Sequence, residues 1–272
     1  MLKACDVIKY YAESGRPGHV CHAVNGISMN FEGNTVYSLV GESGSGKSTL
    51  ARMLAFVERP TSGDIEIDGK SVFAYGKTGL RAKRADIQLV MQDGLSSLDP
   101  RQTVEQILAE PLKDLMGMGM AECTVRIREL ANLVGLPEEL LTRRPRTLSG
   151  GQQKRVCIAR AISVKPKLII FDESLSGLDV TLRKQIMDLL MKLKEELQCS
   201  YLFITHDIEV AMYLSQVIIV MKNGQIVETV KDVRSYDDFT HSYSKSLVKA
   251  LMFKKTALQT ISCVVFDKKY IS

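Results

Sequence analysis

The sequence predicts an α/β protein built around a mainly parallel sheet. Three observations support this fold class: short apolar segments rich in β-branched or aromatic residues, amphipathic helical segments between them, and turn pairs that open two hairpins. Strands are predicted at residues 36–40, 87–91, 168–171 and 201–205. The clearest helix is predicted over residues 182–197, where apolar side chains recur at helical spacing: Ile186, Leu190, Leu193 and Leu197.

Two predicted hairpins add antiparallel strands. The first covers residues 64–72 and turns at Asp68-Gly69. The second covers residues 217–228 and turns at Asn223-Gly224. Both are turn pairs that tolerate positive φ angles. We therefore expect an antiparallel β-layer beside the main sheet.

A helical region is predicted inside the chain, where Gly and Pro residues separate helical segments between residues 92 and 164. A chain of 272 residues is long enough for one large domain that carries an inserted subdomain. We expect the domain to cover residues 1–250 and the helical subdomain to cover about 92–164. For the C-terminal tail, residues 251–272, the sequence indicates no role.

The composition argues against several classes of protein. No apolar run approaches the roughly 18 to 20 residues that cross a bilayer, and the N-terminus has no signal-peptide core, so a cytosolic chain is expected. Six cysteines without a C-x-x-C pair indicate reduced thiols, not a zinc site or a disulfide framework. The net charge of +5 is mild, and its basic clusters are compatible with nucleic acid, lipid head groups or water as neighbours.

A phosphate-binding pattern follows the first predicted strand. Residues 41–48 read GESGSGKS and fit G-x-x-x-x-G-K-[ST], with a helical run over 49–56 behind them. Glycines let the backbone wrap a phosphate, the amides and the helix N-terminus supply positive potential, and the lysine neutralises phosphate oxygens. The residues of this loop predicted to bind ATP are Gly41, Ser43, Gly44, Gly46, Lys47, Ser48 and Thr49.

Two acidic residues end the third predicted strand. This arrangement places Asp172 near a Mg²⁺ ion held by Ser48 and leaves Glu173 free to polarise a water molecule. Taken alone the pair is a weak signal, because an acid after a buried strand often caps a helix. The phosphate-binding loop makes the catalytic interpretation the preferred one.

The segment LSGGQ lies 20 residues before Asp172 and opens a helix, so it presents a helix N-terminus to an anion. Its five residues match the signature of the ABC ATPase family, which this chain resembles over about residues 1–250. The resemblance implies that the segment contacts the γ-phosphate of ATP bound to the opposite subunit of a dimer. The residues concerned are Ser149, Gly150, Gly151 and Gln152.

The same resemblance implies roles for four more residues. Gln92 resembles the Q-loop glutamine that touches Mg²⁺ or water and senses the membrane partner. Asp179 lies in a segment similar to the D-loop, which joins the two sites of a dimer, and His206 resembles the switch histidine that contacts the γ-phosphate. Tyr11 resembles the aromatic residue that stacks on adenine, with Tyr10 an equal rival and a core position the structural alternative.

Two segments narrow the resemblance to the ATPases of dipeptide, oligopeptide and nickel importers. They are residues 92–104 and 240–247. Ser174 and Ser242 stand where many of these relatives have proline, and neither change removes a catalytic group.

The resemblance implies the ATP-hydrolysing subunit of an importer, with ATP and Mg²⁺ as cofactors, bound peripherally at the cytoplasmic face of the cell membrane. Its expected partners are a second ATPase subunit (the same chain or a related one), two transmembrane permeases and, indirectly, an extracytoplasmic solute-binding protein. Nucleic acid is not expected as a partner. Peptides, nickel and metal chelates stay open as cargo.

The alternative function is a soluble ABC ATPase that acts on nucleic acid or ribosomes. It is disfavoured because the chain holds one compact motif set, without a long coiled coil or a second ATPase unit. A P-loop kinase or GTPase would share residues 41–48 but gives no reason for LSGGQ or for His206.

Overall fold

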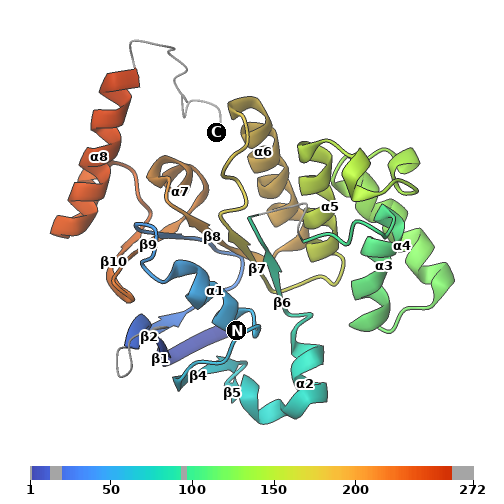
Figure 1. Cartoon of the computed structure of the whole chain (residues 1–272), viewed down its shortest axis with the longest axis horizontal. Coiled ribbons are helices and arrows are strands. Elements are labelled where there is room, and N and C mark those ends of the chain that lie inside the picture. Colours follow the sequence, from blue (N-terminus) through green and yellow to red (C-terminus); the bar gives the residue numbers. More distant parts are fainter. Residues whose placement is uncertain (1, 13–19, 93–96, 259–272) are drawn as a thin grey trace.

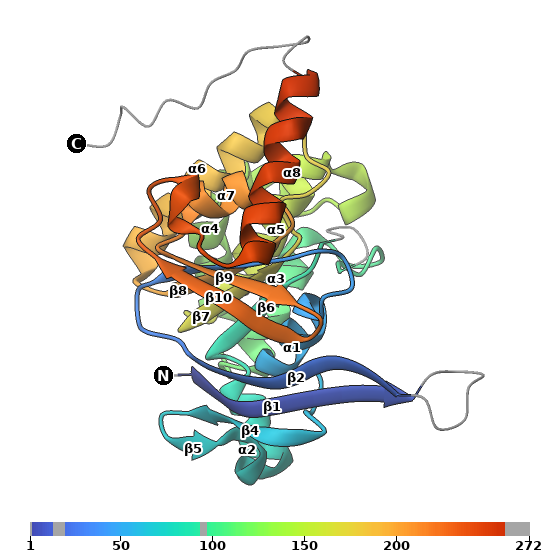
Figure 2. The ribbon, with the colours of Figure 1, turned by 90° about the vertical axis from the view of Figure 1, so that its left-hand side faces the viewer.

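Two sheets lie one above the other, with helices between and around them (Figures 1 and 2). The structure is a computed structural model that describes residues 2–12, 20–92 and 97–258. Among the helices of these ranges, none combines the length and apolar character that a membrane crossing requires.

The larger sheet has the strand order β10-β9-β3-β8-β7-β6 and is parallel except for β10, which pairs antiparallel with β9. Its strands are β3 (Val36–Val40), β6 (Ile87–Val90), β7 (Leu168–Asp172), β8 (Ser200–Thr205), β9 (Val217–Lys222) and β10 (Gln225–Lys231). The four strands predicted from apolar segments are therefore confirmed, with ends that differ by one residue at most. They are the neighbouring strands β3, β8, β7 and β6, of which β6 lies at one edge of the sheet.

The smaller sheet is antiparallel, with the order β2-β1-β4-β5. Its strands are β1 (Leu2–Ala12), β2 (Val20–Asn30), β4 (Ser62–Ile67) and β5 (Lys70–Ser71). The first predicted hairpin belongs to this layer, as expected. The second does not: β9 pairs in parallel with β3 and extends the larger sheet. The physical reason is that residues 218–221 are apolar and buried throughout, as an internal strand covered on both faces requires.

Eight α-helices are present in the described ranges: α1 (Lys47–Leu54), α2 (Gly76–Lys83), α3 (Val104–Asp114), α4 (Met120–Leu133), α5 (Gly150–Ile162), α6 (Val180–Leu197), α7 (Ile208–Leu214) and α8 (Ser242–Leu258). Helices α3, α4 and α5 come from the region expected to be helical and stand together at one side of the molecule (Figure 1). Helix α8 continues past residue 250, where the sequence places the end of the domain; residues 259–272 of the expected tail lie outside the described residues.

Alternate side chains of the central strands face two different cores. Leu168 and Ile170 pack with α1 and the smaller sheet, whereas Ile169 and Phe171 pack with α3 to α6. Helix α1 thus lies between the two sheets, as Figure 2 shows. Strand β8 lies between β3 and β7 and runs parallel to both, so the carboxyl ends of these three strands lie side by side at the same edge of the sheet. That edge is where a doubly covered sheet binds its ligands.

Candidate active site

The predicted phosphate-binding loop connects β3 to α1, and two of its glycines leave no room for a side chain. A Cβ on Gly41 would lie 2.1 Å from the carbonyl oxygen of Met221, and one on Gly46 would lie 1.9 Å from that of Ala23. Gly46 also has φ +102°, a left-handed conformation that glycine adopts without strain. Strands β2 and β9 therefore hold the loop by direct backbone contact, and only glycine fits there.

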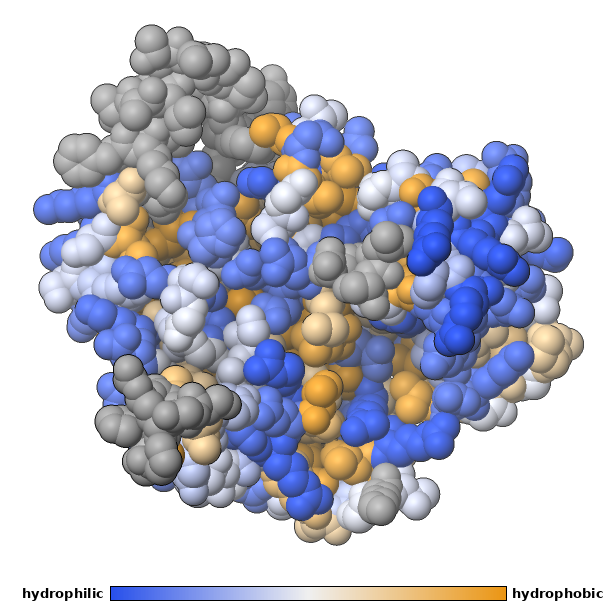
Figure 3. All heavy atoms as spheres, in the orientation of Figure 1, coloured by the Kyte–Doolittle hydropathy of each residue, from blue (hydrophilic) through white to orange (hydrophobic). Residues whose placement is uncertain are grey.

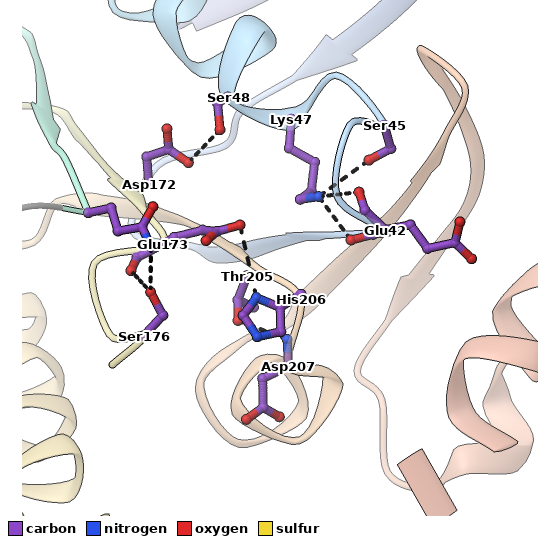
Figure 4. Close-up of polar contacts among 12 residues, drawn as sticks. Glu42, Ser45, Lys47, Ser48, Asp172, Glu173, Ser176, Thr205, His206 and Asp207 are labelled. Atoms are coloured by element: carbon purple, nitrogen blue, oxygen red, sulfur yellow. Dashed lines mark hydrogen bonds and ion pairs between the residues drawn. The ribbon is translucent and has the colours of Figure 1, made fainter. Parts of the chain in front are cut away.

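Lys47 is the first residue of α1 and is 4% exposed. Its ammonium lies inside the loop, where it donates to the carbonyl oxygens of Gly41 at 2.9 Å and Glu42 at 2.7 Å and to Oγ of Ser45 at 3.3 Å (Figure 4). Burial lowers the pKa of Lys47, and the negative charge of Glu173 opposes that shift. The loop thus presents a lysine ammonium to any phosphate that it surrounds.

Ser48 and Asp172 face each other beside the lysine. The Ser48 hydroxyl donates to Oδ1 of Asp172 at 3.0 Å. Burial raises the pKa of the Asp172 carboxyl above its ordinary value, and the hydrogen bond from Ser48 opposes that rise. A hydroxyl and a carboxylate at this separation are the oxygen ligands that Mg²⁺ prefers, so this pair fits the expected ion.

Glu173 and His206 follow β7 and β8 and meet at the sheet edge, with Nδ1 of the histidine 3.9 Å from Oε1 of the glutamate. Their side chains point into the space that Lys47 also faces (Figure 4). Glu173 has φ +44°, an uncommon conformation for a residue with a side chain, and its amide donates to the carbonyl oxygen of Ile204 at 3.0 Å. Strained backbone of this kind clusters at catalytic positions.

Gln92 follows the end of β6 by two residues, and its side chain contacts the segment that carries Glu173. Its Nε2 donates to Oγ of Ser176 at 3.4 Å, and that hydroxyl donates to the carbonyl oxygen of Glu173 at 2.5 Å. On the other side, the ammonium of Lys154 from α5 donates to the carbonyl oxygen of Gln92 at 3.0 Å. The next four residues, 93–96, lie outside the described residues.

The LSGGQ segment forms the start of α5 and is separate from these residues. Ser149 is the N-cap: its Oγ accepts from the amide of Gln152 at 3.3 Å, and Oε1 of Gln152 accepts from the amide of Ser149 at 2.9 Å. In the described part of the chain, the hydrogen bonds of these two side chains join them to each other's backbone and not to Lys47. Gly150 is exposed and Gly151 is buried against Leu182. The structure thus does not bring the LSGGQ segment, which is predicted to contact a phosphate, to the phosphate loop of the same chain.

Asp179 caps α6, where its Oδ1 accepts from the amide of Leu182 at 2.8 Å. One turn later, Nη1 of Arg183 lies 3.5 Å from Oδ2 of Asp207, the residue after His206. Asp207 in turn caps α7 by accepting from the amides of Glu209 and Val210. The segment after Asp179 is therefore tied to the segment that carries His206.

Tyr11 lies on β1, 37% exposed, and its hydroxyl donates to Oε1 of Glu58 at 2.6 Å. Glu58 also pairs with Arg52 of α1 at 3.3 Å, so Tyr11 is linked to the helix that begins at the phosphate loop. The Lys9 ammonium lies 5.3 Å from the centre of the Tyr11 ring. Tyr10, the rival, is 45% exposed and has His22 as its aromatic neighbour, 6.0 Å away between ring centres. The contacts favour Tyr11 over Tyr10 as the residue connected to the site.

Several residues that contact the site or its neighbouring segments are missing from the sequence prediction, among them Tyr243, Lys154, Arg183 and Glu58. Each acts through a contact distant in sequence, such as the 201 residues between Glu42 and Tyr243. Only Tyr243 had a signal, because it lies in the segment 240–247 that resembles one family of importers.

A parallel sheet that ends in a phosphate-binding loop and a pair of carboxylates defines the class of P-loop nucleotide-hydrolysing proteins. Residues 24–176 match the family described as ABC transporter. The nickel import ATP-binding protein NikE of Escherichia coli O157:H7 is 41% identical over 231 residues, which cover 84% of this chain and 86% of that protein. NikE of Shigella flexneri is 40% identical with the same coverage.

Two solved structures share the fold. The ATP-binding cassette MJ0796, a dimer in a post-hydrolysis state bound to ADP and Pi, has a TM-score of 0.76 and 31% identity over 86% of this chain and 100% of that one. The protein cbiO1 from Clostridium perfringens, part of the ABC transporter complex cbiONQ, has a TM-score of 0.73 and 28% identity over 96% and 95% of the two chains. The chain belongs to the ABC transporter family. The predicted fold class and the predicted activity, an ATP-binding and ATP-hydrolysing subunit, are confirmed.

Proposed function

We propose that this chain drives import of nickel, metal chelates or peptides by coupling ATP-driven dimer closure to partner permeases. The observation that carries the proposal is the convergence of Lys47, the Ser48–Asp172 pair and the Glu173–His206 pair at one sheet edge, in a chain 41% identical to a nickel import ATP-binding protein. Residues 1–250 would form the ATPase domain, with the helical subdomain at about 92–164 and the tail at 251–272.

Each residue of the site has a proposed task. The loop amides and Lys47 hold the β- and γ-phosphates, and Tyr11 stacks on adenine. Ser48, Asp172 and Gln92 would hold Mg²⁺, which neutralises phosphate charge when bound. Glu173 accepts a proton from the attacking water, and the nearby His206 orients toward the γ-phosphate. These residues would supply part of the positioning and charge neutralisation that phosphoryl transfer chiefly requires.

A second ATPase subunit, identical or related, would complete the site. The support is that, among the described residues, Ser149 and Gln152 bond each other at an exposed helix N-terminus and not Lys47, while the relative MJ0796 is dimeric. On closure, the γ-phosphate bound to one subunit would replace the cap of the other subunit's helix, since an anion is favoured at a helix N-terminus. Asp179, exposed at the start of α6, would join the two sites across the dimer.

A groove offers a contact for the permeases. It holds about 620 Å³ between α2, β6, α3 and α5, and its walls combine apolar Leu80, Leu89 and Leu115 with charged Arg81 and Glu110. In Figure 3 apolar atoms reach the surface among hydrophilic ones in the lower central part of the view, around α2. A short amphipathic helix of a membrane subunit fits such a surface. The groove borders β6, the strand that leads to Gln92. Binding of a permease helix in the groove would therefore affect the position of Gln92. The chain would then sit at the cytoplasmic face of the membrane, with a solute-binding protein on the far side.

The test is affinity purification of the tagged chain from gently solubilised native membranes, with mass spectrometry of what accompanies it. We expect two multi-span permeases and a second ATPase subunit. Ribosomal or nucleic-acid-bound proteins in their place would overturn the transport function and leave the ATPase activity standing. A Lys47→Ala chain serves as the control for the site, because it should lose ATP binding while the permeases still copurify.

A further inference from the structure

One peptide unit of the phosphate loop, between Gly41 and Glu42, is held at both of its polar ends. Its carbonyl oxygen accepts from the Lys47 ammonium at 2.9 Å, and its N–H donates to the hydroxyl oxygen of Tyr243 at 3.2 Å. A peptide unit is planar and rigid, so fixing its N–H also fixes the direction of its carbonyl. The tyrosine therefore acts on one of the three oxygen atoms that accept from the lysine ammonium.

Tyr243 is itself firmly placed. It lies in the first turn of α8, is 7% exposed and packs in an apolar cluster with Val40 and Ile208. The Lys222 ammonium lies 4.4 Å from its ring centre. Val40 precedes the phosphate loop and Ile208 begins α7, so this cluster joins α8 to the strand and the helix that flank the site. A side chain packed in this way holds its hydroxyl in one position.

The start of α8 is fixed from the other side by Glu228 of β10. Its Oε1 accepts from the amide of Thr240 at 2.6 Å and from the amide of His241 at 3.0 Å. Nδ1 of His241 then accepts from the amide of Tyr243 at 3.2 Å. A continuous set of contacts thus runs from β10 to the tyrosine and on to the phosphate loop.

We propose that Tyr243 is a positioning residue for nucleotide binding, whose hydroxyl sets the Gly41–Glu42 peptide so that its carbonyl holds the Lys47 ammonium in the phosphate site. Tyr243 touches no phosphate itself and works through Lys47. The inference rests on the proposed ATPase site, and it adds a residue outside the segment 24–176 that matches the family. Helix α8 thereby becomes part of the nucleotide-binding machinery.

The test compares Tyr243→Phe with Tyr236→Phe in the full chain. Each change removes one hydroxyl; that of Tyr236 donates to Oε1 of Glu209 on α7 at 3.0 Å. A single hydrogen bond is worth about a 2- to 10-fold change in an equilibrium. We expect Tyr243→Phe to weaken binding of ATP and ADP by that factor, raise the KM for ATP in parallel and leave kcat within about twofold. Tyr236→Phe should bind ATP as the wild type does.

A second readout needs no nucleotide. Hydrogen exchange followed by mass spectrometry should show faster exchange in the peptide that contains Glu42 for Tyr243→Phe, and unchanged exchange there for Tyr236→Phe. If Tyr243→Phe lowers only the midpoint of thermal unfolding, with ATP affinity and loop exchange both as in the wild type, the tyrosine is a packing residue and the inference is overturned. If the wild type fails to bind ATP, the proposed function falls and the inference falls with it.

Discussion

Ser48 and Asp172, 124 residues apart in sequence, are joined by a hydrogen bond of 3.0 Å at the junction of α1 and β7. This contact brings together the phosphate loop and the acidic strand, which the sequence describes as separate motifs. It also predicts where the divalent cation binds, since both side chains turn oxygen atoms to the same point.

Replacing Ser48 by Ala removes one of the two oxygens. We expect ATP hydrolysis by Ser48→Ala to require at least about 10-fold more Mg²⁺, the cost typical of disturbing a metal site. ATP binding without Mg²⁺ should change little, because Lys47 is untouched. A titration of hydrolysis rate against Mg²⁺ at saturating ATP measures this, with Ser28→Ala on exposed strand β2 as the control. An unchanged Mg²⁺ requirement would remove Ser48 from the metal site.

Glu173→Gln should separate ATP binding from hydrolysis. The amide keeps the size of the side chain but accepts no proton, so the rate should fall by about 10² to 10⁴. ATP affinity should stay near that of the wild type, and ATP-bound dimers should accumulate. Single-turnover hydrolysis and light scattering measure the two effects, with the exposed Glu195→Gln of α6 as the matched control. Normal turnover by Glu173→Gln would assign the proton acceptor to another residue.

The glycines of the phosphate loop give a pair of matched variants. A Cβ at Gly46 would lie 1.9 Å from the carbonyl oxygen of Ala23, whereas a Cβ at Gly44, with φ +80°, would meet nothing within 4 Å. Gly44→Ala should therefore lower the free energy of unfolding by only about 1–2 kcal/mol, the strain of an alanine in the left-handed conformation. Gly46→Ala should cost at least about 3 kcal/mol, because the backbone clash adds to that strain, and should abolish ATP binding. Urea unfolding and ATP titration of both variants test this; equal losses would contradict the role of β2 in shaping the loop.

Glu228 gives a prediction with a defined pH window. Burial by itself raises the pKa of this carboxyl, but the polar groups of Ser244, Thr240 and His241 outweigh it and lower the pKa to about 2. A carboxyl with a depressed pKa stabilises the folded state above its unfolded pKa, and that stabilisation is lost as pH falls toward the folded value. Glu228→Gln should therefore unfold more easily than the wild type at pH 7, by about 1–3 kcal/mol.

That difference should stay constant from pH 7 to about pH 5 and shrink between about pH 4.5 and pH 2. Urea unfolding of both proteins across this range is the measurement. A difference that grows as the pH falls would show that Glu228 does not act as a charged acceptor.

The sequence predicts the central strands well because burial on both faces leaves a continuous apolar run, as in residues 168–171. It does not predict β1 and β2, whose residues alternate irregularly between buried and exposed and whose pairing contains register shifts. The placement of the second hairpin was wrong because a turn pair identifies a hairpin but not the sheet that it joins.

The candidate site likewise contains residues that the sequence predicts and residues that it does not. Lys47, Asp172 and Glu173 stand in short contiguous motifs whose chemistry follows from the order of residues. Tyr243 and Arg183 support the site through contacts that exist only once the chain has folded. A single sequence predicts the residues proposed to contact the nucleotide more readily than the residues that hold them in place.

The strand order also sets when the site can exist. The strand that carries the phosphate loop and the strand that carries the acids have β8 as their common neighbour, and β8 starts at Ser200. About 160 residues follow β3 before β8 begins, which corresponds to roughly 10 to 30 s of synthesis on the ribosome. Until β8 is made, β3 has an unpaired edge, and so does β7 once it has been synthesised, which is a hazard for wrong association between nascent chains. A bound nucleotide can stabilise the protein only after this interval, because binding stabilises a protein only once its site has formed.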